Sequence, residues 1–136
     1  LLKRIYDLKG KKVAVLGLSF KPNTDDMREA PSIAVTEKLL EEGATVVAYD
    51  PVAVDNAKTV LPDQVNYAES AEEAVQDADV AIILTEWKQI KEFPLSGYKQ
   101  RMNKALLFDG RNCFNLDQVK NSGVEYHSIG RPVIYG

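Results

Sequence analysis

The chain has 136 residues, 45% of them hydrophobic and 27% charged, which suits one soluble globular domain. Its formal net charge of −3 gives no general positive field for nucleic acid, so a phosphate group would have to be bound by local cations. One cysteine excludes an internal disulfide, one histidine argues against a His-based metal site, and no apolar run approaches the roughly 20 residues of a membrane helix. We therefore expect a cytoplasmic protein without a metal.

The first nine residues differ in character from the rest. Leu1, Ile5 and Leu8 fall on one helical stripe, and the sequence does not start with methionine. We interpret residues 1–9 as the end of a linker helix from a missing upstream region, and residues 10–136 as one domain. The alternative is a short N-terminal helix that packs on its own domain.

Strand-like and helix-like segments alternate along the chain. Gly43 is suited to ending the first helix, and Ser70 and Asn115 are suited to capping later ones. We expect strands at 12–16, 45–49, 64–67, 80–84, 105–108 and 124–127, and helices at 32–42, 52–60, 71–76, 87–92, 95–101 and 116–120. This alternation predicts an α/β, Rossmann-like, doubly wound and mostly parallel six-stranded sheet, with helices on both faces and strand order 3-2-1-4-5-6.

A long polar loop over residues 17–29 follows the first strand. It is about twice the usual two to six residues of such a connection, and it carries two cations, three acids and an asparagine. Polar segments at 85–87 and 109–112 follow the fourth and fifth strands. All three would meet at the carboxyl edge of the sheet, so we expect a ligand crevice there, between the first and fourth strands.

The cations of this edge are Lys21, Arg28 and Arg111. Lysine offers phosphate a point charge, and arginine offers a planar fork. We favour ligand contact for Lys21 and Arg111, while Phe20 either lines the pocket or anchors the loop. The alternative for the cations is that they pair with nearby acids and hold the loops in place; these acids are Asp25, Asp26, Glu29 and Asp109, and we favour that structural role for Asp25 and Asp26. Asn23 either contacts a ligand or caps the turn.

The first strand-to-helix turn lacks the glycines of a dinucleotide fingerprint, because only Gly17 stands at a suitable position. Asp50 ends the second strand, where dinucleotide-binding domains hold a ribose diol. Followed by Pro51, it also makes a simple turn into a helix, and we favour that interpretation.

Three single residues invite catalytic or ligand roles and are interpreted as structural. Trp87 is expected in the core or at a subunit interface. Cys113 has no histidine nearby in sequence and is expected to be a small buried residue. His127 lies within the last strand. No paired acid and base stand out in the sequence.

The run from Gly17 to Ser32, GLSFKPNTDDMREAPS, resembles the C-terminal UDP-binding domain of the UDP-glucose 6-dehydrogenases, in the UDP-glucose/GDP-mannose dehydrogenase family. The segments 49–51, 84–87 and 109–112 stand in matching order, and the resemblance spans nearly all of the chain. The NTDD and TEW forms favour UDP-glucose; UDP-N-acetylmannosamine and GDP-mannose are the alternatives.

The resemblance implies an oxidoreductase that converts UDP-glucose to UDP-glucuronate in two hydride transfers to NAD. It implies that Phe20, Lys21 and Arg111 bind the UDP-sugar, that Arg28 reaches NAD bound mainly by a missing N-terminal domain, and that the full-length protein is a homodimer. The family's catalytic cysteine motif is absent, since Cys113-Phe114 is not followed by Pro-Lys. We therefore expect no catalytic residue in this chain and no activity of the chain alone. Two other classes remain open, a free-standing nucleotide sensor and a module that mainly mediates dimerisation.

Overall fold

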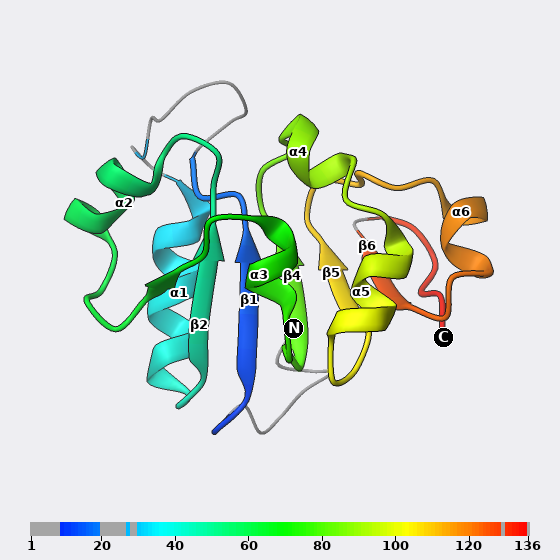
Figure 1. Cartoon of the computed structure of the whole chain (residues 1–136), viewed down its shortest axis with the longest axis horizontal. Helices are drawn as coiled ribbons and strands as arrows, with labels where there is room; N and C mark the ends of the chain where they lie inside the picture. Colours follow the sequence, from blue (N-terminus) through cyan, green and yellow to red (C-terminus); the bar gives the residue numbers. More distant parts are fainter. Residues whose placement is uncertain (1–8, 20–26, 28–29, 129, 136) are drawn as a thin grey trace.

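The computed structural model describes residues 9–19, 27, 30–128 and 130–135 (Figure 1). Their centre is a parallel sheet in the order β3-β2-β1-β4-β5-β6, which confirms the predicted fold class and strand order. The strands are β1 Lys12–Leu16, β2 Thr45–Tyr49, β3 Asn66–Tyr67, β4 Val80–Ile83, β5 Leu106–Asp109 and β6 Glu125–Ser128. An antiparallel bridge joins Tyr126 of β6 to Ile134.

Helices cover both faces of the sheet. In Figure 1, α3 and α5 lie in front of the strands and α1 lies behind them. The helices are α1 Pro31–Glu41, α2 Val54–Val60, α3 Ala71–Val75, α4 Lys88–Lys91, α5 Leu95–Arg101 and α6 Leu116–Lys120. In the described part of the chain, no helix is long and apolar enough to cross a membrane.

The four inner strands β2, β1, β4 and β5 each contribute to two cores, because successive side chains point to opposite faces. Val13 and Val15 of β1 pack with residues of α1 and α2, whereas Ala14 and Leu16 pack with residues of α3 to α6. All four are fully buried. This is why β1 is a continuous apolar run, as expected of a strand covered on both sides.

Local signals place several helix ends where the sequence predicts them. Pro31 stands in the first turn of α1, and Gly43 follows α1 with a φ of 87°. Ser70 accepts a hydrogen bond from Glu73 N at 3.1 Å, and Asn115 forms a capping box at the start of α6.

The predicted helix over 52–60 begins two residues late, at Val54. The amides of Val52 and Ala53 both donate to Oδ1 of Asp50, so this carboxylate forms a turn before the helix starts. The predicted linker helix over residues 1–9 falls almost entirely outside the described residues and stays a prediction.

Candidate functional site

The carboxyl ends of β1 and β4 touch where the strand order reverses. Gly17 has a φ of 89°, and a Cβ atom built on it would lie 2.6 Å from Thr85 Cβ and 2.7 Å from Thr85 N. Thr85 Oγ1 in turn donates to the carbonyl of Ser19 at 2.7 Å. Glycine is therefore required at position 17, because a side chain would separate two segments that are in direct contact.

The carboxylate of Asp50 is a second tie at this edge. Oδ2 accepts hydrogen bonds from Leu18 N at 2.8 Å, Ser19 N at 3.1 Å and Trp87 Nε1 at 3.1 Å, while Oδ1 binds the first amides after β2. Asp50 is only 4% exposed, so these five bonds compensate the loss of water around a buried charge. One residue thus holds the ends of β1, β2 and β4 together.

This arrangement decides between the two interpretations of Asp50. A dinucleotide pyrophosphate needs free backbone amides at the first strand-to-helix turn. Here the amides of Leu18 and Ser19 donate to Asp50 itself. The described residues of this turn therefore do not fit a dinucleotide, and the turn interpretation of Asp50 agrees with the geometry. Trp87 is 4% exposed and belongs to the core.

Arg111 lies just after β5 and reaches back toward the end of β4. Its Nε donates to the carbonyl of Leu84 at 2.9 Å and lies 3.3 Å from Oε2 of Glu86. Both side chains are 34% exposed, so the ion pair is worth at most about 1 kcal/mol, and its value lies in orientation. The guanidinium is fixed through Nε at the predicted crevice.

The backbone of Arg111 is held by Asp109, the last residue of β5. Oδ1 accepts from Arg111 N at 2.9 Å, and Oδ2 accepts from Cys113 N at 2.6 Å and from the Tyr126 hydroxyl at 2.6 Å. Asn112 within this turn has a φ of 52°, a left-handed conformation that asparagine tolerates. The turn is thus built around a carboxylate that is 1% exposed.

Cys113 and His127 have the surroundings of structural residues. Burial, followed by the charge of nearby Asp109, raises the pKa of the Cys113 thiol to about 12, which disfavours a nucleophilic thiolate. His127 Nε2 lies 2.7 Å from Glu125 Oε2, and its ring stacks on Phe108 at 4.5 Å between centroids. Among the described residues, no cluster of His, Cys, Asp and Glu could hold a metal ion.

The structure describes only part of the predicted site. Arg111 lies at the predicted edge, whereas Phe20, Lys21 and Arg28 fall outside the described residues, and their roles stay predictions. Asn23, Asp25 and Asp26 fall outside them as well. Sequence reasoning named Asp109 as a possible partner of the cations and missed Leu84 and Glu86 as partners of Arg111. The one available signal was an aspartate at the end of a strand, repeated at positions 50 and 109.

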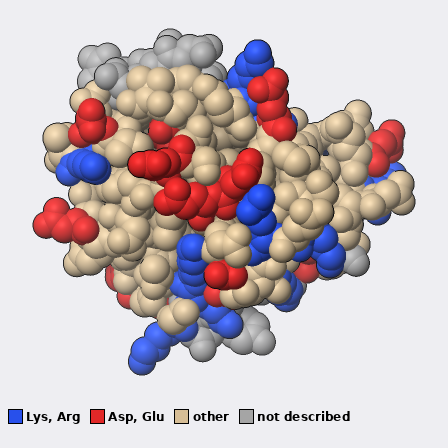
Figure 2. Space-filling view, viewed as in Figure 1, with Lys and Arg blue, Asp and Glu red and all other residues tan. Residues whose placement is uncertain are grey.

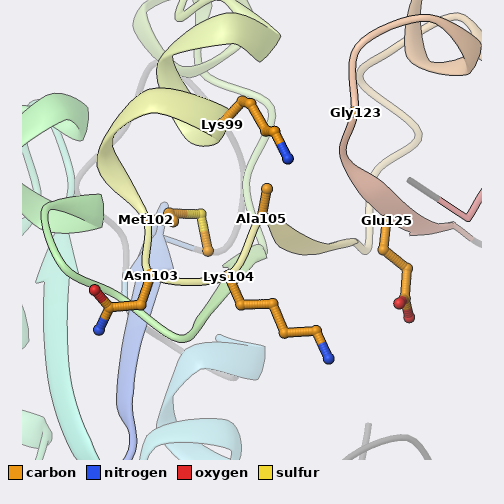
Figure 3. A pocket seen from close by; sticks show the side chains of 7 residues that line it. All are labelled: Lys99, Met102, Asn103, Lys104, Ala105, Gly123 and Glu125. Atoms are coloured by element: carbon orange, nitrogen blue, oxygen red, sulfur yellow. The ribbon is translucent and has the colours of Figure 1, made fainter.

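Two hollows among the described residues are lined by residues other than Arg111. One of about 410 Å³ is lined by Lys99, Lys104 and Glu125 around the start of β5 and β6, at the edge opposite Arg111 (Figure 3). Another of about 330 Å³ lies between Tyr49 and the segment after α4. Figure 2 shows acidic side chains gathered around α3, on the face of the sheet that is in front in Figure 1, and α3 carries two glutamates in its first turn. Neither hollow provides a built site for a diphosphate.

Comparison with known proteins gives a consistent family. The sequence model described as "UDP-glucose/GDP-mannose dehydrogenase family, UDP binding domain" matches residues 14–116. UDP-glucose 6-dehydrogenase YwqF of Bacillus subtilis is 53% identical over 133 residues, covering 98% of this chain and 30% of that protein. TuaD of the same organism, also named UDP-glucose 6-dehydrogenase, is 42% identical and is covered over 30% of its length. This chain thus spans about 30% of these curated relatives.

Solved structures agree in fold. A UDP-glucose dehydrogenase from the archaeon Pyrobaculum islandicum is 35% identical with a TM-score of 0.76, covering 93% of this chain and 27% of that one. An NDP-N-acetyl-D-galactosaminuronic acid dehydrogenase from Methanosarcina mazei is 32% identical with a TM-score of 0.81, and the match covers 96% of this chain and 27% of that one. These neighbours are similar to this chain along most of its length.

Proposed function

The chain belongs to the UDP-glucose/GDP-mannose dehydrogenase family and contains its UDP-binding domain; from this we propose that it is the C-terminal, UDP-sugar-binding part of an NAD-dependent UDP-glucose 6-dehydrogenase. The intact enzyme would oxidise UDP-glucose to UDP-glucuronate in the cytoplasm. UDP-glucose is favoured because the relatives at 53% and 42% identity both carry that enzyme's name. The alternatives are UDP-N-acetylmannosamine and GDP-mannose.

In this proposal the chain binds substrate and the rest of the protein carries out the oxidation. NAD, the acceptor of the hydrides, is assigned mainly to the part of the protein outside this chain. The first turn supports this assignment, because the amides of Leu18 and Ser19 already donate to Asp50. Arg28 is proposed to reach that NAD from the loop after β1. The catalytic cysteine, a central helical region and a homodimer interface would also come from outside residues 10–136.

The observation that carries the proposal is the position of Arg111. It lies at the carboxyl edge where a doubly wound sheet binds ligands, and Nε is fixed to Leu84 and Glu86. A guanidinium whose orientation is set in advance loses little side-chain freedom when it binds a diphosphate or a sugar. We propose that Lys21 supplies a second positive charge and that Phe20 lines the same pocket.

The test replaces Arg111 with alanine in the full-length enzyme. One charge-assisted contact is worth about 1.5–3 kcal/mol, so the KM for UDP-glucose should rise roughly ten- to hundredfold, with the KM for NAD changed less than about twofold. Arg101→Ala is the matched control, because Arg101 ends α5 near the opposite edge of the sheet and pairs with exposed Glu72. If Arg111→Ala kept the wild-type KM and turnover, the site assignment would be wrong. Assays with UDP-N-acetylmannosamine and GDP-mannose decide the sugar.

A further inference from the structure

A chain of hydrogen bonds connects the C-terminal segment with the backbone of Arg111. Arg131 Nη2 donates to the Tyr126 hydroxyl at 2.7 Å, and that hydroxyl donates to Asp109 Oδ2 at 2.6 Å. The other oxygen of Asp109 accepts from Arg111 N at 2.9 Å. Tyr126 and Arg131 both lie beyond residues 14–116, the part that the family model matches.

The two residues in the middle of this series of hydrogen bonds, Tyr126 and Asp109, are both buried. Tyr126 is fully buried, and Asp109 is 1% exposed. A buried carboxylate is tolerated only when hydrogen-bond donors surround it, and here the Tyr126 hydroxyl and the Cys113 thiol are side-chain donors beside two backbone amides. Removal of the Tyr126 hydroxyl takes one donor from Asp109 Oδ2, which keeps the hydrogen bond from Cys113 N. The turn that carries Arg111 then loses one of its fixed points.

Arg131 in turn fixes Tyr126. Its guanidinium lies 5.6 Å from the centre of the Tyr126 ring, and it donates to Ser128 Oγ at 3.0 Å and to the carbonyl of Phe114 at 2.9 Å. Phe114 follows the Arg111 turn, whereas Ser128 ends β6. Arg131 therefore joins the end of the sheet's last strand to the far side of that turn.

We propose that Tyr126 and Arg131 are positioning residues for the UDP-sugar, which act on Arg111 through Asp109 without touching the ligand. This inference rests on the proposed function, because it takes Arg111 to be a substrate contact. Burial and the hydrogen bond to Asp109 raise the pKa of the Tyr126 hydroxyl, so it keeps its proton and remains a donor at neutral pH. The orientation of Arg111 is thus set from the C-terminal segment as well as from Leu84 and Glu86.

The test is Tyr126→Phe in the full-length enzyme. Loss of the hydroxyl's hydrogen bond to the Asp109 carboxylate acts on the ligand only through Arg111. It should therefore raise the KM for UDP-glucose roughly fivefold, less than removal of Arg111 itself, with kcat and the KM for NAD changed less than about twofold. Tyr98→Phe is the matched control. Tyr98 is fully buried in the same core, and its hydroxyl has no hydrogen-bond partner among the described residues. That variant should keep both KM values.

A double-mutant cycle separates positioning from general stability. In an Arg111→Ala background, Tyr126→Phe should raise the KM for UDP-glucose less than twofold, because its effect passes through Arg111. An equal rise in both backgrounds would overturn the proposal, as would a folded Tyr126→Phe enzyme with the wild-type KM. If Tyr126→Phe fails to fold, Arg131→Lys replaces it in the same cycle, since lysine keeps the charge but loses the fork. An unchanged KM in Arg111→Ala would instead refute the assignment of Arg111 to the substrate site, on which this inference rests.

Discussion

The indole Nε1 of Trp87 donates a 3.1 Å hydrogen bond to Oδ2 of Asp50, and both side chains are buried. The pair joins the end of β2 to the segment after β4, across the strand between them. The same oxygen also accepts from Leu18 and Ser19, where the loop with the predicted substrate residues begins. One carboxylate therefore supports three of the segments around the proposed site.

Asp50→Asn should lower the free energy of unfolding by about 2–4 kcal/mol, because an amide group would face N–H donors and leave some of them unpaired. Urea unfolding followed by the fluorescence of Trp87, the only tryptophan, measures the change. Asp55→Asn is the control, since Asp55 is exposed in the first turn of α2. This replacement should lower the free energy of unfolding by at most about 1 kcal/mol. Equal unfolding midpoints for the two variants would contradict this role of Asp50.

Gly17→Ala should destabilise the fold by several kcal/mol, since it adds a clash with Thr85 to the cost of a positive φ. Gly10→Ala separates the two contributions. Gly10 has a φ of 77°, and a Cβ built on it would have nothing within 4 Å. Gly10→Ala should therefore lower the free energy of unfolding by only about 1 kcal/mol, the cost of the backbone conformation. If thermal unfolding showed that both variants lose the same amount of stability, the close contact between Gly17 and Thr85 would not contribute to the cost of Gly17→Ala.

The sequence predicts those elements whose signals are local. β1 and β2 match their predicted bounds residue for residue, because each is an apolar run that is buried in the sheet. β3 has only two of the four predicted residues, since Val65 N bonds Pro62 O in a turn instead of joining the ladder. Edge strands are set by their one neighbour, and a sequence window does not contain that neighbour.

The site divides in the same way. Arg111 can be placed from the strand order, because the ends of parallel strands meet at one edge. Its side-chain partners cannot, since Leu84 and Glu86 are 27 and 25 residues away and reach it only through the folded sheet. The hydrogen bonds of Asp50 likewise span up to 37 residues. Hydrogen bonds that side chains make between segments far apart in the chain produce no periodic pattern in the sequence.

The folded chain should protect Cys113 from alkylation at about pH 9. Burial and Asp109 raise its pKa from 9.0 to about 12, so the folded thiol is roughly one-thousandth thiolate where an unfolded one is half thiolate. Iodoacetamide should label the native chain far more slowly than the urea-unfolded chain, and Cys113 is the only thiol that can react. Cys113 is only half-buried, so similar labelling rates in the two states would contradict its raised pKa.

The same shift gives a pH dependence of stability. Because the folded pKa lies above the unfolded value, the folded state keeps a proton that the unfolded state releases. The resulting stability is fully present below about pH 9 and is lost as the pH rises toward 12. The raised pKa values of Tyr98 and Tyr126 act in the same direction. Urea midpoints should therefore fall on the alkaline side, and Cys113→Ala should reduce the fall that begins near pH 9.

The chain alone should neither bind NAD measurably nor produce NADH from UDP-glucose. In the described part of the first turn the amides of Leu18 and Ser19 donate to Asp50, and the raised pKa keeps the single cysteine protonated in a structural turn. Titration calorimetry with NAD and with UDP tests the first expectation. We expect no heat with NAD and weak binding of UDP, which Arg111→Ala should weaken further. Steady NADH formation by the chain would show that a catalytic group lies within residues 1–136. Tight NAD binding without turnover would instead show that the dinucleotide enters by a route that does not use the amides of Leu18 and Ser19.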